Sequence, residues 1–135
     1  MTFDELDKSF AKLLAGIPKA KRRLVESCGN KMYEKVMRNI DTTVKSETGN
    51  LKQGVTKVIG SEGGYSAIKP DWEKAPHTYL VENGHKSITG KGESQKMNGW
   101  VSGKHMYRNA LAELAEELET DAEKMLDELV GDAFD

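Results

Sequence analysis

Apolar side chains recur at alternating spacings of three and four residues at both ends of this 135-residue chain. Such spacing places side chains on one face of an α-helix, so each end of the chain should form long amphipathic helices. The N-terminal stripes are Phe3, Leu6, Phe10, Leu13 and Ile17, followed by Val25, Cys28, Met32, Val36 and Ile40. The C-terminal stripe is Leu111, Leu114, Leu118, Ala122, Met125 and Leu129. Helices built on these stripes must account for most of the fold.

Local signals set the expected ends of these helices. Thr2 is a good N-cap, and Glu5 stands three residues later as its capping-box partner. Pro18 either starts a second helix or kinks a single long one. The last helix should run from about Lys104 to Val130, a length on the order of 40 Å at 1.5 Å per residue.

Glycine-rich turns divide the middle of the chain into short segments. We expect strands over residues 51–59 and 65–68. Residues 77–82 should form a strand, or a short helical turn leading into one. Residues 86–98 have the composition of a flexible loop. We expect Tyr79, Val81, Trp100 and Met106 to lie in or near the core.

The sequence therefore predicts one α+β domain over residues 1–135, a size that suits a single modest core. It should comprise a long N-terminal helical region (2–44), a small antiparallel sheet with a flexible loop (48–101) and a long C-terminal helix (104–130).

Charge is unevenly distributed along the chain, although the net charge is only −2. Residues 101–135 hold ten acidic and three basic side chains, whereas the rest of the chain is net basic. Such a division favours head-to-tail self-association or a basic partner. A well-solvated acidic helix would explain it equally well.

No pattern of catalytic residues emerges. The histidines, His77, His85 and His105, do not follow one another at helical spacing, and the single cysteine, Cys28, excludes an intrachain disulfide. We therefore expect no enzyme, no cofactor and no metal. A metal-dependent enzyme using His77 and His85 near Glu82 stays open as an alternative.

Basic residues gather at Lys19, Lys21, Arg22 and Arg23, which makes a small DNA-associated protein a second alternative. The cluster spans little more than one helical turn and has no interleaved aromatic residues for base stacking. The N-terminus lacks the pattern of a signal peptide, and no apolar run reaches the ~20 residues of a membrane span. We expect a soluble protein with no membrane partner.

Three strings, in order, resemble the small tail-completion or head–tail joining proteins of long-tailed bacteriophages, the gene-product-ten-like tail-component family. Thr48-Gly49-Asn50-Leu51 is similar to that family's step from helix into sheet. The string from Ala75 to His85, which contains Val81-Glu82-Asn83-Gly84, resembles its apolar-Val-Glu-x-Gly block. Gly103-Lys104-His105-Met106 resembles the start of its last helix, although Lys104 stands where the family often has Arg-Pro.

The resemblance implies a structural virion protein of a phage or prophage that completes the tail, or joins it to the head, as a ring at the neck. Its partners would be copies of itself and neighbouring neck or tail proteins, with nucleic acid present only as DNA passing through the ring. It would be made in the cytoplasm of the bacterial host.

Candidate contact residues follow from charge. We expect Lys86, Lys91 and Lys96 in the loop to meet a neighbouring ring. We expect Glu116, Glu119, Glu123 and Asp127 on the last helix to pair subunits. Ordinary solvation would explain both sets as well.

Overall fold

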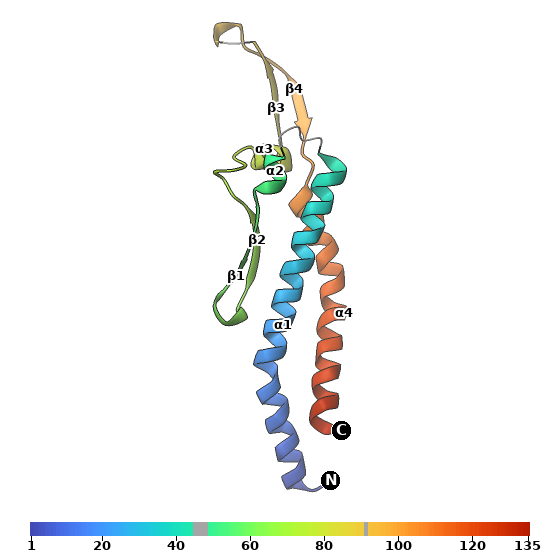
Figure 1. The fold of residues 1–135 in the computed structure, drawn as a ribbon. Coiled ribbons are helices and arrows are strands. Elements are labelled where there is room, and N and C mark those ends of the chain that lie inside the picture. The colour runs from blue at the N-terminus through green and yellow to red at the C-terminus, as the bar shows by residue number, and fades with distance from the viewer. Residues whose placement is uncertain (45–48, 91) are drawn as a thin grey trace.

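Two long helices lie side by side and give the protein an elongated shape (Figure 1). The computed structural model describes residues 1–44, 49–90 and 92–135. Helix α1 (Phe3–Thr43) packs along helix α4 (Met106–Phe134), and both chain termini lie at the same end of this pair. One β-hairpin lies along α1 and another projects beyond the opposite end of the pair (Figure 1). The fold is α+β, as the sequence predicts.

Short elements connect the two long helices. In chain order they are α2 (Asn50–Gln53), β1 (Val55–Ile59), η1 (Ser61–Gly63), β2 (Ser66–Pro70), α3 (Thr78–Asn83), β3 (Gly84–Thr89), η2 (Gly92–Ser94) and β4 (Lys96–Ser102). The strands form two separate antiparallel pairs, β1 with β2 and β3 with β4, rather than one sheet. Each pair is a hairpin, so the strand pairing among the described residues is local in sequence.

Helix α1 is continuous through Pro18 over 41 residues, so one helix forms and not two. The predicted capping box is confirmed. The amide of Glu5 donates to Thr2 Oγ1 at 3.2 Å, and the amide of Thr2 donates to Glu5 Oε2 at 2.9 Å. These bonds satisfy backbone donors that have no partner within the helix.

The predicted strand over residues 51–59 is wrong in its first part. Leu51 belongs to the short helix α2, and the strand begins only at Val55. Gly49 precedes α2 with a φ of 72°, a left-handed conformation that glycine adopts without a Cβ penalty. Thr48 lies outside the described residues.

For residues 77–82, the second of the two alternatives is confirmed: residues 78–83 form the short helix α3, which leads directly into β3. One further segment differs from the expectation. The segment 86–98, predicted as a flexible loop, supplies most of the β3–β4 hairpin. The register pairs Lys86 with Trp100 and skips Asn98, which makes a bulge in β4. Cross-strand pairing stabilises such polar strands, and composition does not reveal it.

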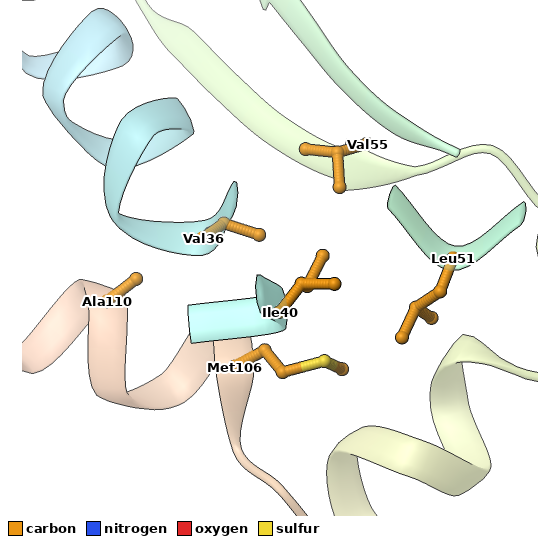
Figure 2. Packing of buried hydrophobic residues seen from close by; sticks show 6 residues of the cluster. All are labelled: Val36, Ile40, Leu51, Val55, Met106 and Ala110. Atoms are coloured by element: carbon orange, nitrogen blue, oxygen red, sulfur yellow. The ribbon is translucent and has the colours of Figure 1, made fainter. Parts of the chain in front are cut away.

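The hydrophobic core lies at one end of the helix pair. Figure 2 shows its six side chains converging from α1, α2, β1 and α4: Val36, Ile40, Leu51, Val55, Met106 and Ala110. Burying a side chain the size of Leu51 contributes about 1.5–3 kcal/mol. Met106 is in the core as predicted, and Val81 packs against it. Tyr79 and Trp100 were predicted wrongly, since they are 62% and 61% exposed.

The β1–β2 hairpin approaches α1 closely at Gly29. Ser66 Oγ donates to the carbonyl of Val25 at 3.0 Å. A Cβ on Gly29 would lie 2.9 Å from Ser66 Cβ, so only a glycine permits this approach. Helix α1 is therefore packed between α4 and the β1–β2 hairpin near its middle.

Candidate interaction surfaces and the hairpin–helix joint

Glu82 fastens the projecting hairpin to helix α4. Its carboxylate accepts hydrogen bonds from the amides of Tyr107 at 3.0 Å and Arg108 at 2.9 Å, in the first turn of α4. The residue at the N-cap position, His105, provides no side-chain cap and adopts a left-handed φ of 49°. Glu82 thus caps the helix from a distant part of the chain, and its charge is favourable at the positive end of the helix dipole.

Backbone contacts complete this attachment. The amide of Lys104 donates to the carbonyl of Val81 at 2.7 Å, and the amide of His105 donates to the carbonyl of Glu82 at 3.1 Å. A Cβ on Gly103 would lie 2.3 Å from the carbonyl oxygen of Glu82 and 2.8 Å from the amide nitrogen of Gly84. A glycine is required there. We call these residues, 81–84 with 103–108, the hairpin–helix joint.

The joint unites two of the three strings that carry the family resemblance. Val81-Glu82-Asn83-Gly84 supplies the carboxylate and carbonyls, and Gly103-Lys104-His105-Met106 supplies the close backbone approach and the start of α4. The contacts of the joint therefore explain the residue types of these two strings. The third string, of which the structure describes residues 49–51, places Leu51 in the core.

Tyr107 lies at the inner side of the joint. Burial, and secondly the negative charge of Glu82, raise the pKa of its phenol to about 12, so it is neutral at physiological pH. Among the described residues, the buried side-chain atoms that lack a hydrogen-bond partner are Tyr107 OH and His105 Nδ1. Neither atom belongs to a recognisable catalytic arrangement.

A hollow of ≈ 380 Å³ opens beside the joint. Its lining is mostly apolar and comes from the end of α1, from α3 and from the base of the hairpin: Thr43, Val44, Leu80, Val81, His85, Val101, Ser102 and Lys104. His85 and Lys104 are the titratable residues in this lining. Among its described residues, the lining contains no Asp or Glu side chain with which either could form an acid–base pair.

Ion pairs hold α4 against α1. The pairs are Lys31 with Asp121 at 2.7 Å, Lys35 with Glu117 at 2.7 Å, and Arg38 with Glu113. The hydrogen bond from Lys35 is the main cause that lowers the pKa of Glu117. Part of the acidic charge of α4 is therefore neutralised within the chain and is not available to a partner.

The predicted pairing residues of α4 lie outside this row. Glu116, Glu119, Glu123 and Asp127 are all exposed. Because the fold does not cover these four side chains, they are accessible to another molecule.

Lys86 and Lys96 are exposed and belong to β3 and β4. We call the β3–β4 hairpin the arm, and it projects beyond the end of the helix pair that is opposite to the chain termini (Figure 1). Lys91 lies outside the described residues. Sequence reasoning missed the apolar surface at the base of the arm, where Trp100 and Val101 are exposed. The sequence did not reveal this exposure, because consecutive strand residues such as Trp100 and Val101 point to opposite faces, and their apolar character does not show which face is covered.

The metal-dependent alternative used His77 and His85 near Glu82. In the part of the chain that the structure describes, no three His, Cys, Asp or Glu side chains are placed to hold a metal ion. Cys28 is half-buried. Desolvation, with a smaller contribution from Asp121, raises the pKa of its thiol, which makes the reactive thiolate scarcer.

No family model, curated protein or solved structure matches this chain. Over the described residues, no helix is at once long and apolar enough to cross a bilayer.

Proposed function

We propose that this protein is a non-enzymatic structural component of a long-tailed phage or prophage. It completes the tail, or joins it to the head at the neck, as a ring of identical subunits. Its location would be the neck or tail of the virion, after synthesis in the host cytoplasm.

The observation that carries the proposal is the hairpin–helix joint. Two of the three strings by which the chain resembles the tail-completion family meet there, through the bonds from Tyr107 and Arg108 to Glu82. A joint of this kind fixes the direction of a projecting arm relative to a long helix. A subunit that must contact neighbours above and beside it in a ring needs such fixed geometry.

Two kinds of surface support the same role. The arm carries the exposed Trp100 and exposed lysines, and large aromatic residues often anchor protein interfaces. The helix pair carries exposed acidic residues and, near the chain termini, exposed apolar ones such as Phe3. Both surfaces suit contacts with other proteins.

Electron microscopy of particles assembled without the protein tests the proposal. We expect filled heads separated from tails, or tails that end prematurely. Supplying the wild-type protein should restore complete particles, and so should the control variant Trp72→Ser, which changes an exposed side chain away from the joint and arm. Normal tails attached to filled heads in the absence of the protein would overturn the proposal.

A further inference from the structure

Helix α1 has an uncovered apolar row in its N-terminal half. Phe3, Phe10, Leu14 and Ile17 are exposed, Phe3 by 87% and Leu14 by 66%. Among the described residues of α1, none from Phe3 to Cys28 is buried, because the core lies at the other end of the helix. Phe10 has one edge-to-face contact with Phe134, at 5.3 Å between ring centroids, which still leaves it half exposed.

Helix α4 has a similar row. Leu118, Leu126 and Val130 are exposed, Leu126 by 51%, whereas Leu114 of the same helix is buried. Helix α1 covers only one flank of α4, because two helices in contact shield the narrow seam between them. The apolar surface of each helix is wider than that seam, and a further helix is needed to cover it.

Charge continues both rows, with opposite signs. Lys21 follows Ile17 by four residues and is exposed, so it extends the row of α1. Glu119 and Glu123 precede Leu126 by seven and three residues and are also exposed, so they extend the row of α4. Each row thus has an apolar part near the chain terminus and a charged part nearer the core.

The two rows also lie at matching heights. The helices are antiparallel: Gly16 of α1 lies beside Leu129 of α4, and Lys31 pairs with Asp121. Leu14 and Ile17 are therefore level with the region of Leu126 and Val130. By the same count, Lys21 is level with the turn that contains Glu123.

From this complementarity we propose that α4 of one copy docks against the N-terminal half of α1 in a second copy lying alongside in the same orientation. Leu126 and Val130 then cover Leu14 and Ile17, and Glu123 faces Lys21. Contact of α4 with α4 would place acids against acids, which like-charge repulsion disfavours. The inference deepens the proposed ring by naming its two mating faces, and to that extent rests on the proposed function.

Disulfide trapping tests the contact. In a Cys28→Ser background, chains carrying Leu14→Cys and chains carrying Val130→Cys are oxidised separately and as a mixture. We expect covalent dimers from the mixture and few from either variant alone. Dimers formed equally by each variant alone, or none from the mixture, would overturn the proposal.

Dissociation constants from sedimentation equilibrium provide a second test. Leu126→Ser should weaken self-association at least about tenfold, because it removes a central apolar contact. Trp72→Ser, an exposed change of similar kind away from both rows, should leave association unchanged. Circular dichroism checks that both variants keep their helices. Equal effects of Leu126→Ser and Trp72→Ser on the dissociation constant would contradict the proposed docking contact.

Charge exchange distinguishes the pairing from general repulsion. Lys21→Glu and Glu123→Lys should each weaken association about fivefold, and the double variant should recover most of the loss. A wild-type protein that stays monomeric at its highest soluble concentration overturns this contact, even if particles without the protein lack joined tails. If the copies pair as described but particles made without the protein are normal, the contact between copies is supported and the proposed function is wrong.

Discussion

At the scale of single residues, Glu82 makes the contacts that attach the projecting hairpin to α4. It lies in α3, yet it caps α4 through two charge-assisted hydrogen bonds from main-chain amides. A carboxylate that precedes a turn has no evident purpose in the linear sequence. Its purpose follows once the chain brings residue 107 back to it, which is a tertiary event.

We expect Glu82→Gln to lower the free energy of unfolding by about 1 kcal/mol, the usual effect of losing a helix cap and its favourable charge. The amide keeps the size of the side chain but loses the charge and one acceptor. Urea denaturation measures the difference. Glu93→Gln, an exposed change in the projecting hairpin, is the matched control and should be neutral. Equal stability of the two variants would show that the cap contributes nothing.

At the scale of elements, α1 is the support on which the other parts assemble. It packs against α4 along one flank and against the β1–β2 hairpin along another. Helical periodicity predicts that α1 is amphipathic, but it does not say which neighbour meets which flank. Gly29 lets the β1–β2 hairpin approach α1 at Ser66, and Lys35 pairs with Glu117 of α4.

Gly29→Ala should destabilise the protein by about 1–2 kcal/mol. The forced shift against Ser66 costs about 1–3 kcal/mol, and the better helix propensity of alanine returns up to about 1 kcal/mol. Thermal or urea unfolding provides the measurement. Gly16→Ala in the same helix meets only a terminal methyl of Leu129, at 3.0 Å, and should not be destabilising. The contact at Ser66 would be refuted if both variants were equally stable.

The pair formed by Lys35 and Glu117 makes stability depend on pH. Because the folded protein lowers the pKa of Glu117 below its ordinary 4.5, the unfolded chain takes up this proton more readily. The stabilisation is complete above pH 4.5 and is lost as the pH falls through the lowered folded value. The stability difference between wild type and Lys35→Met should therefore shrink as the pH falls below 4.5.

Urea midpoints over a pH series check this dependence. Lys19→Met, a change at an exposed lysine of the same helix, should differ from wild type by a constant amount over that range. A Lys35→Met difference that is also constant with pH would mean that the ion pair does not control the titration of Glu117.

At the scale of the whole molecule, the core is small and lies at one end, so the two extremities depend on it differently. The helix pair extends from the core toward the chain termini, and the β3–β4 arm extends the other way (Figure 1). The main contacts of the arm are between its own strands and with α3. An extremity of this kind is available for binding without being needed for folding.

Replacing residues 87–99 by Asn-Gly should shorten the arm and leave the core intact. Lys86 and Trp100 are register partners, so a two-residue turn can join them. We expect an unfolding midpoint close to that of wild type and failure to restore particles made without the protein. Trp72→Ser is the control that should restore them. A collapse of stability would show that the arm is part of the core.

The sequence by itself determined the long helices, the capping box at Thr2, the uneven charge and Met106 in the core, because these follow from local spacing and residue type. Tertiary structure decided the rest. It made one helix across Pro18, turned residues 86–98 into a hairpin, exposed Trp100 and paired Glu117 with Lys35 while leaving Glu119 open. Periodicity shows which side chains share a face, but only packing against distant segments decides whether that face is covered.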